Sequence, residues 1–591
     1  MVTYAERPWT KHYDEHVPAS LEPYPTKVLH EYLTESAKKH PNKVALITSA
    51  KLPVLGRQDT RMTYGELEEK SNALATALVE LGVKKGDRVA IVMPNTVAFA
   101  VSYWAILKAG GVVSATNPTY PAQRMAYQIN DCDAEVVICL SLFYNTIKSI
   151  QSETKAKTII VSNIKDYLPS MAKLLFTLAK EKKDGHYVEL RQGDVSFEAL
   201  VSKYTGRSVQ VDVTQDDVAL FQYTGGTTGV SKGAMGTHRA LVMNSYAMQQ
   251  WTGFYAGHFD QYDPMTYLGA IPMFHVFGLV VLLTQCIIAG GTIVLIPNPR
   301  DVDELVDVIG HYSPQVMLGV PALYNAINNH PRIVSGEVSL SSFILNASGS
   351  APLPTKTKEE YDARVPVGIT EGYGMSETFV AVTANPLKGE QKTRSVGMPY
   401  PDIDIKIMQI DDPNTEVPVG DVGEMVICAP NLMIGYHGMP TETKNTLRQD
   451  AEGRTWIYTG DIARMDEDGY FYIVDRKKDM ALIGGYNVYP ASVEVALKNH
   501  PAVFEVGVAA IPHPEKEGQE ALKAWIVLQP DKTVSKEELI KHCEQHLVQY
   551  EIPRRYSFVD ELPKSAVGKT LRRELIRMEM EEADKIARDM A

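Results

Sequence analysis

Residues 223–233 read Tyr-Thr-Gly-Gly-Thr-Thr-Gly-Val-Ser-Lys-Gly, a loop of glycines and hydroxyls that ends in a lysine. Glycines permit positive φ and a close backbone approach, while hydroxyls and a lysine offer hydrogen bonds and positive charge to phosphate. The candidate phosphate ligands are Thr224, Gly225, Gly226, Thr227, Thr228, Gly229 and Lys232. Because the common NTPase loop needs Gly before its lysine and Ser or Thr after it, Ser231 and Gly233 disfavour a kinase or GTPase.

The size and charge of the chain narrow the classes of protein. Its 591 residues and 45% apolar composition allow a large core and more than one domain. The net charge of −13 argues against a general nucleic-acid binder, because phosphate backbones are held by an excess of Lys and Arg. Five scattered cysteines predict neither a disulfide framework nor a zinc site and fit a reducing cytoplasm.

The N-terminal stretch and the apolar runs give no export or membrane-span signal. The N-terminal stretch lacks the apolar core of a secretory signal. The longest apolar run, 276–290, is shorter than the roughly twenty residues of a membrane span, so we interpret it as a buried helix. We therefore expect a cytoplasmic protein.

The hydrophobic pattern predicts an α/β fold. Apolar strand-like runs such as 89–92, 136–139 and 292–296 alternate with helical stretches such as 64–81 and 301–309. Such alternation is typical of largely parallel sheets. We expect a large N-terminal domain of parallel α/β sheets.

The last third of the chain differs in pattern. From about Gly420, short alternating strands predict a β-rich subdomain. After residues 475–479 a glycine loop, two helices and two strands predict a small mobile C-terminal α+β domain. The expected domains are 1–477, which binds the acid and ATP, and 478–591.

A basic amphipathic segment spans residues 164–183. Met171, Leu174, Leu175 and Leu178 recur at helical spacing among lysines. The favoured interpretation is that this face packs on the protein's own body. The alternative is peripheral contact with an anionic membrane surface, on the inner face of the membrane.

Six further motifs follow residues 223–233 along the chain. They are 272–278 (Pro-Met-Phe-His-Val-Phe-Gly), 349–352 (Gly-Ser-Ala-Pro), 372–378 (Gly-Tyr-Gly-Met-Ser-Glu-Thr), 458–461 (Tyr-Thr-Gly-Asp), 475–479 (Asp-Arg-Lys-Lys-Asp) and 563–569 (Pro-Lys-Ser-Ala-Val-Gly-Lys). Over about residues 26–573 the chain resembles the adenylate-forming superfamily of acyl-CoA synthetases, luciferases and peptide-synthetase adenylation domains. It is most similar to bacterial long-chain fatty acid–CoA ligases.

The resemblance implies roles at single positions. Catalytic roles fall on Lys569, which reaches the α-phosphate and the acid, on His275 at the acid carboxylate, on Lys232, and on Glu377, the Mg²⁺ ligand. Nucleotide and CoA contacts fall on Gly349, Ser350, Ala351, Gly372, Tyr373, Ser376, Asp461, Arg476, the hinge residue Lys478, and Gly485 at the pantetheine tunnel. Ser350 stands where the family usually has Gly, and Leu482 where luciferases and plant ligases usually have Lys.

The expected reaction joins a fatty acid to coenzyme A in two steps. ATP and the acid give acyl-AMP and pyrophosphate, and CoA then displaces AMP; ATP, Mg²⁺ and coenzyme A are the implied cofactors. Alternatives are a medium-chain or aryl acid–CoA ligase, a fatty acyl-AMP ligase, and a non-catalytic lipid-binding relative. Chain-length preference and a homodimer stay open.

Overall fold

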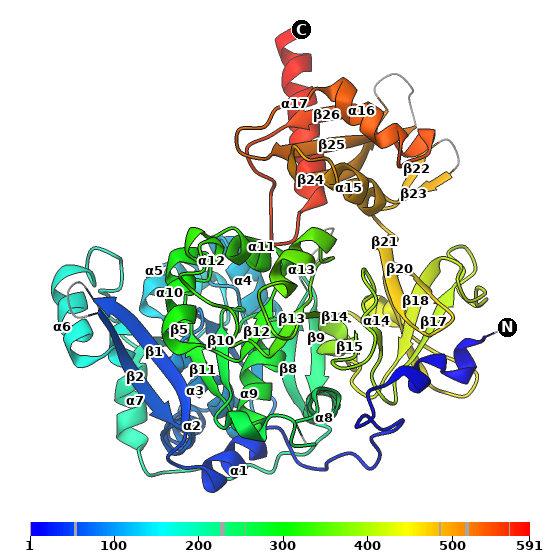
Figure 1. Ribbon diagram of the computed structural model, residues 1–591. Helices are drawn as coiled ribbons and strands as arrows, with labels where there is room; N and C mark the ends of the chain where they lie inside the picture. The colour runs from blue at the N-terminus through cyan, green and yellow to red at the C-terminus, as the bar shows by residue number, and fades with distance from the viewer. Residues whose placement is uncertain are drawn as a thin grey trace.

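The computed structural model describes residues 2–52, 56–224, 231–254, 256–483, 486–513, 519–565 and 568–590, with side chains as far as residue 582. A large body carries a smaller C-terminal domain, which lies above it in Figure 1. The mixed α/β class, with parallel sheets in the body, is confirmed.

Two sheets with mainly parallel strands form most of the body. The first has the order β16-β15-β14-β13-β12-β10-β11-β1-β2, and the second has the order β7-β6-β5-β3-β4-β8-β9. The first contains β1 (Val44–Leu52), β2 (Gly56–Thr63), β10 (Thr266–Gly269), β11 (Thr292–Leu295), β12 (Val316–Gly319), β13 (Leu345–Ser348), β14 (Ile369–Met375), β15 (Val380–Ala384) and β16 (Met398–Pro399). The second contains β3 (Arg88–Val92), β4 (Val112–Ala115), β5 (Val136–Leu140), β6 (Thr158–Ser162), β7 (Val195–Ser196), β8 (Val218–Tyr223) and β9 (Gly233–Thr237).

Helices connect and cover these strands. They are α1 (Glu31–Lys39), α2 (Tyr64–Glu80), α3 (Val97–Lys108), α4 (Ala122–Asp131), α5 (Ser141–Ile150), α6 (Ser170–Ala179), α7 (Phe197–Tyr204), α8 (His238–Thr252), α9 (Gln285–Ile288), α10 (Val302–Tyr312), α11 (Pro321–Asn328), α12 (Pro331–Val334) and α13 (Thr355–Asp362). A further helix, α14 (Pro440–Thr446), packs on the β-rich subdomain. The α3 helix is buried along its whole length, as expected for a helix that is apolar all round. The ammonium of its last residue, Lys108, is neutralised by Glu68 at 2.5 Å.

The apolar run at 276–290 forms a buried helix, as predicted. It consists of a π-helical turn, η6 (Phe277–Thr284), followed by α9. Within the described ranges, no helix combines the length and apolarity that crossing a bilayer requires.

The β-rich subdomain lies beside the sheets of the body. Its strands are β17 (Asp404–Met408), β18 (Gly423–Cys428), β19 (Leu447–Gln449), β20 (Thr455–Met465) and β21 (Phe471–Arg476). The N-terminal residues are held against it, because Arg7 binds Asp404 with an Nε–Oδ1 distance of 2.7 Å. The subdomain confirms the short alternating strands predicted after about residue 420.

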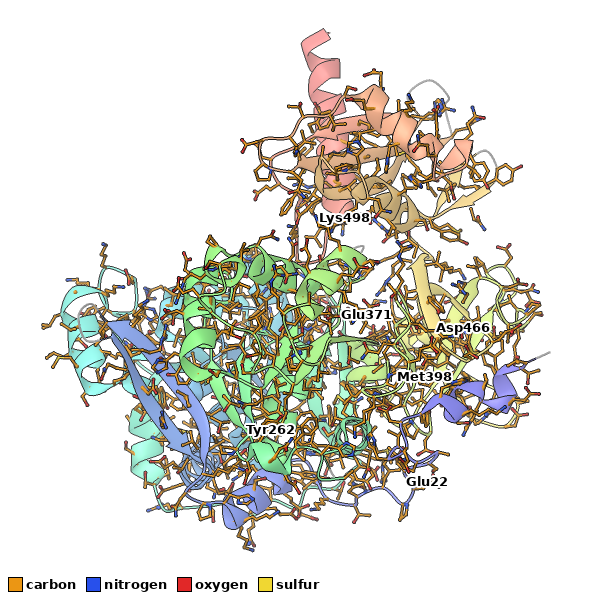
Figure 2. All side chains as sticks on the ribbon, in the orientation of Figure 1. Glu22, Tyr262, Glu371, Met398, Asp466 and Lys498 are labelled. Atoms are coloured by element: carbon orange, nitrogen blue, oxygen red, sulfur yellow. The ribbon has the colours of Figure 1, made fainter. Side chains whose placement is uncertain are left out.

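The C-terminal domain has its own apolar core. It is built from β22 (Ala481–Ile483), β23 (Tyr486–Val488), α15 (Pro490–Lys498), β24 (Val503–Pro512), β25 (Glu520–Leu528), α16 (Lys536–Glu544), β26 (Arg555–Phe558) and α17 (Arg572–Met590). Leu497, Val508 and Ile526 belong to a cluster separate from that of the body. Figure 2 places Lys498 on the side of this domain that faces the body. The domain boundary at 477/478 remains a prediction.

Candidate active site

A continuous cavity of about 2000 Å³ lies between the body and the C-terminal domain. It brings together every predicted site residue that the structure describes. These are Thr224, Lys232, His275, Gly349, Ser350, Ala351, Gly372, Tyr373, Ser376, Glu377, Asp461, Arg476, Lys478 and Lys569. The predicted ligands Gly225, Gly226, Thr227, Thr228, Gly229 and Gly485 lie outside the described residues.

The base of the predicted phosphate loop is closed by the β8–β9 hairpin. The Thr224 amide donates to the Lys232 carbonyl at 2.9 Å, and the Ser231 hydroxyl donates to the Thr224 carbonyl at 2.7 Å. The Lys232 ammonium lies 5.0 Å from the ring centroid of Tyr436, which is within cation–π range. The Tyr436 hydroxyl donates to Glu377 Oε1 at 2.7 Å. The loop lysine and the predicted metal ligand therefore share one aromatic neighbour.

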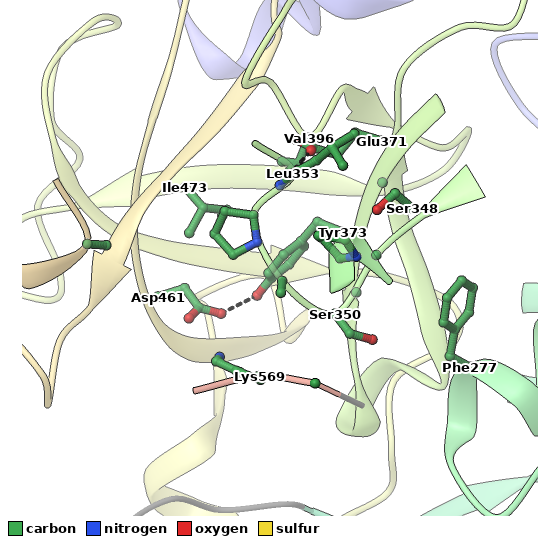
Figure 3. Close-up of a pocket in the computed structure, with 18 of the residues that line it drawn as sticks. Phe277, Ser348, Ser350, Leu353, Glu371, Tyr373, Val396, Asp461, Ile473 and Lys569 are labelled. Carbon is green, nitrogen blue, oxygen red and sulfur yellow. Dashed lines mark hydrogen bonds between the residues drawn. The ribbon is translucent and has the colours of Figure 1, made fainter. Parts of the chain in front are cut away.

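Asp461 is the centre of a buried polar network. It is the register partner of Arg476 on the antiparallel strands β20 and β21, and Arg476 Nε lies 2.5 Å from Asp461 Oδ1. The Tyr373 hydroxyl donates to the other carboxylate oxygen at 2.5 Å, as Figure 3 shows. Burial, and then the charge of Asp461, raises the pKa of Tyr373 far above its usual value, so the phenol stays protonated. The network fixes the orientation of both oxygens.

Backbone geometry shapes the neighbouring loops. A Cβ on Gly372 would lie 2.9 Å from the Thr383 carbonyl oxygen, and one on Gly374 would lie 1.2 Å from the Val380 carbonyl oxygen. Both positions therefore require glycine. Ser350 has φ +69°, a left-handed conformation that costs an L-residue free energy but suits Gly. A glycine at position 350 would adopt this conformation without that cost.

His275 lies just before η6 and is half buried. The Phe277 amide donates to His275 Nδ1 at 3.3 Å, so the neutral ring carries its proton on Nε2. Burial lowers the pKa of His275 to about 4. At neutral pH this side chain is therefore an uncharged N–H donor at the cavity wall.

Lys569 reaches the cavity from the loop before α17. In Figure 3 it lies beside Asp461. The loop touches the body, because a Cβ on Gly568 would lie 3.2 Å from the Ala322 Cβ. Burial, and then the nearby positive charge of Arg476, lowers the pKa of Lys569 to about 8. A cation with a lowered pKa in a cleft is typical of a functional group.

Two cavity residues were missed by the sequence reasoning. Glu371 is buried and accepts a hydrogen bond from the Leu353 amide at 3.0 Å. Burial raises its pKa to about 7. A carboxylate in the apolar strand directly before Gly372 was a signal that could have identified it. Tyr436, far from Glu377 in the chain, had no comparable local signal.

The donors around Glu377 fit Mg²⁺ held together with a nucleotide. Among the residues that the structure describes, no group of three or more His, Cys, Asp or Glu side chains could hold a metal ion. Glu377 is a buried carboxylate at the cavity wall, and the hydroxyl of Ser376 stands next to it in the chain. Mg²⁺ commonly binds one carboxylate plus phosphate oxygens and water, so this single ligand is sufficient.

The comparisons with known proteins cover nearly the whole chain. A family model described as AMP-binding enzyme matches residues 33–437, and one described as AMP-binding enzyme C-terminal domain matches residues 492–569. A long-chain-fatty-acid–CoA ligase of Bacillus subtilis (strain 168) is 33% identical over 583 residues, 98% of this chain and 99% of the relative. One of Salmonella typhimurium is 35% identical over 577 residues, 96% of this chain and 97% of the relative.

The fold of this chain is also similar to that of a solved structure. The crystal structure of ATP-bound MatB from Rhodopseudomonas palustris matches with a TM-score of 0.77 and 28% identity, over 93% of this chain and 98% of that chain. Family model, full-length relatives and fold agree in placing this chain in the AMP-binding enzyme family.

Proposed function

We propose that the acid used by this AMP-forming acid–CoA ligase is a long-chain fatty acid. ATP, Mg²⁺ and coenzyme A are its cofactors and co-substrates. In the first step a carboxylate oxygen of the acid bonds to the α-phosphorus of ATP, and the bond to pyrophosphate breaks. In the second step the CoA thiolate bonds to the acyl carbon, and AMP leaves.

The observation that carries the long-chain assignment is the character of one arm of the cavity. Around α8, β10 and η6 most of its lining is apolar or aromatic: Met248, Trp251, Phe254, Tyr267, Val276 and Val281. The polar lining residues in this region are Thr252, His275 and Gln285. Apolar lining with few polar groups suits a hydrocarbon chain, which gains free energy by leaving water. The names of the full-length relatives support the same acid class.

In the first step the protein supplies positive charge where negative charge collects. A carboxylate and a triphosphate repel each other, so the reaction needs positioning and electrostatic stabilisation more than a base. We assign this work to Lys232 on the phosphates, Arg476 on the ribose and phosphate, and Lys569 on the α-phosphate and the acid. Mg²⁺ on Glu377 would neutralise phosphate charge when bound.

The remaining assignments orient the substrates. Asp461 would accept hydrogen bonds from the ribose hydroxyls, and Tyr373 would stack on adenine beside Gly349, Ala351 and the Ser350 backbone. His275 would hold the acid carboxylate end as a neutral Nε2–H donor, because its pKa of about 4 keeps it uncharged. Such a donor orients the carboxylate without pairing so strongly that the oxygen becomes unreactive.

The second step would need a different placement of the C-terminal domain. We propose that this domain rotates about Lys478, so that Lys569 leaves the cavity and the loop containing Gly485 lines the pantetheine path. Lys478 lies two residues after Arg476, the last residue of β21, which is the strand that leads out of the body. The domain boundary at 477/478 is part of this proposal.

Product analysis tests the assignment. Purified protein is supplied with ATP, Mg²⁺ and acids from acetate to palmitate, together with coumarate, with and without CoA. We expect AMP and palmitoyl-CoA that depend on CoA, with little product from coumarate. Acyl-AMP that accumulates regardless of CoA would identify an acyl-AMP ligase, and no pyrophosphate with any acid would identify a non-catalytic lipid-binding relative.

A further inference from the structure

The α6 helix carries an apolar face that the described part of the chain leaves largely exposed. Met171, Leu174, Leu175 and Leu178 follow the i, i+3, i+4, i+7 pattern, and they are 50%, 53%, 42% and 77% exposed. The prediction that this face packs on the protein's own body is therefore wrong. Monomeric soluble proteins rarely leave such a contiguous row of large apolar side chains in water without a partner for it.

The helix is held in place from its opposite side. Ala172 is buried, and the Phe176 ring meets the His186 ring edge-on at 5.4 Å. Beyond the helix, the buried Glu181 carboxylate accepts hydrogen bonds from Lys165 at 2.5 Å and from Asn163 at 2.9 Å. These contacts orient the leucines outward, so their exposure is a property of the fold.

Apolar side chains from neighbouring segments extend this face. Tyr187 is 52% exposed and Leu142, on α5, is 43% exposed. A Cβ on Gly185 would lie 3.4 Å from Leu142 Cδ1, and the Lys182 ammonium lies 5.8 Å from the Tyr187 ring centroid. The loop that follows α6 and the neighbouring α5 thus also carry exposed apolar side chains. In Figure 1, α6 lies at the left edge of the body, well away from the C-terminal domain.

Lysines surround the apolar row. Residues 164–183 contain five lysines and two acids, a local net charge of +3 in a chain of net charge −13. Both acids are already engaged, Asp166 by Lys173 at 3.3 Å and Glu181 by Lys165. Lys180 and Lys183 are exposed and make no ion pair with any residue that the structure describes. Asp184, which is exposed directly after Lys183, lowers the local charge, but residues 164–187 still carry a net charge of +2.

We propose that this surface binds an anionic lipid bilayer. The α6 surface consists of Met171, Leu174, Leu175 and Leu178 with Lys173, Lys180, Lys182 and Lys183. An amphipathic helix with leucines on one face and lysines around it lies in a membrane interface, its apolar face among the acyl chains and its ammonium groups at the anionic headgroups. The inference goes beyond the ligase reaction, and it does not depend on the acid that the enzyme uses.

A second copy of the chain fits this surface less well. A symmetric dimer pairs the same patch on both subunits, so the lysines of one copy would face the lysines of the other. Like charges brought together at an interface are costly. An anionic bilayer instead offers the opposite charge together with a hydrocarbon layer.

Sedimentation of the full-length protein with vesicles tests the proposal. The probes are phosphatidylcholine vesicles with and without about 30% phosphatidylserine. We expect binding to the anionic vesicles, and a loss of about tenfold or more in Leu174→Ser/Leu178→Ser, because each leucine would forfeit its burial among acyl chains. Raising NaCl from about 0.05 to about 0.5 M, or Lys180→Gln/Lys182→Gln/Lys183→Gln, should also weaken binding several-fold.

Matched variants separate this effect from general changes of the surface. Val334→Ser/Val422→Ser removes exposed apolar residues elsewhere, and Lys38→Gln/Lys39→Gln removes exposed lysines on α1. Both controls should bind vesicles like the unaltered chain. Circular dichroism of every variant confirms folding, so the result does not depend on activity with any acid.

Three outcomes would overturn the proposal. They are absence of binding to anionic vesicles, equal binding by the Leu174→Ser/Leu178→Ser variant, and binding that is insensitive to both salt and lipid charge. If size-exclusion chromatography showed a dimer that the leucine variant converts to a monomer, while vesicle binding stayed unchanged, a second copy would be the occupant instead.

Discussion

The body and the C-terminal domain contribute to the cavity in different ways. In the body, sheet register places Arg476 opposite Asp461, and Tyr373 donates to the same carboxylate. From the C-terminal domain, Lys569 enters on a loop that touches the body near Ala322. The geometry around Asp461 is thus a property of the body, whereas the presence of the Lys569 charge in the cavity depends on where the C-terminal domain lies.

The connection between the two parts is polar and local. Arg572 on α17 binds Asp475 at 2.7 Å and Glu494 at 2.9 Å, and the Ala491 amide donates to Asp475 at 2.7 Å. Asp475 belongs to β21, so these contacts join the last strand of the body to the first helix and the last helix of the domain. A change of domain position about Lys478 would have to rearrange this group of contacts.

The largest effect is expected from Lys569→Ala. Removing this cation should slow pyrophosphate release about 10³-fold, because the loss of one preorganised electrostatic group from an active site lowers the rate by a factor of that order. Conversion of supplied acyl-AMP to acyl-CoA should continue at nearly the normal rate. Stopped-flow assays of the two half-reactions measure the contrast. Lys564→Ala, in the same loop but paired with Glu505, is the control, and equal loss of both half-reactions would refute the division of labour.

A substitution in the body, Asp461→Asn, should slow both half-reactions and not the first one alone. Asp461→Asn removes a charged hydrogen-bond partner from Arg476 and from the proposed ribose site, which is needed in both steps. We expect roughly tenfold to hundredfold losses in both half-reactions, given the usual worth of hydrogen bonds to charged groups. Asp412→Asn, in an exposed turn of the same subdomain, should leave both rates unchanged. A loss confined to the first half-reaction would contradict the comparison.

The pH dependence should distinguish the two parts further. Since the pKa of Lys569 is lowered to about 8, its ammonium is mostly present at pH 7 and is lost as the pH rises through 8. The kcat/KM of pyrophosphate release should therefore fall about tenfold by about pH 9, because this parameter reports the free enzyme. Lys569→Arg keeps its charge and should move the decline to higher pH. An identical profile in that variant would assign the titration to another group.

The smallest effect concerns a strained position in the body. Ser350→Gly relieves a φ of +69° but adds freedom to the unfolded chain, so the free energy of unfolding should rise by only about 0.5 kcal/mol. Urea unfolding measures this difference, with Ser350→Ala as the control that keeps the strain. A loss of stability in the glycine variant would mean that the serine hydroxyl contributes more than the strain costs.

Much of the site was predictable because its residues lie in short motifs. Lys232, Asp461, Arg476 and Lys569 were each identified within a few residues of sequence, and the structure places them along one cavity. Their mutual arrangement was not predictable. The pairing of Asp461 with Arg476 depends on strand register, which the sequence pattern specifies only through the full sheet.

Other features required the tertiary structure. The α/β alternation and the separate C-terminal unit followed from hydrophobic periodicity. Periodicity also identified the apolar face of α6, but it contains no information on which element covers a face, so the prediction that the body buries Leu174 and Leu178 failed. Tyr436 was missed for a similar reason, because its contact with Glu377 bridges distant segments.

The network around Asp461 has a consequence for selectivity. Its carboxylate is paired with a guanidinium and a phenol of the protein itself, so each of its two oxygens has a partner within the chain. On the proposed assignment, an incoming ribose must replace an existing hydrogen bond with one of equal quality. Such an exchange adds little to affinity, but it penalises any sugar whose hydroxyls are missing or misplaced. The site would therefore discriminate between nucleotides by the hydroxyl groups of their sugar.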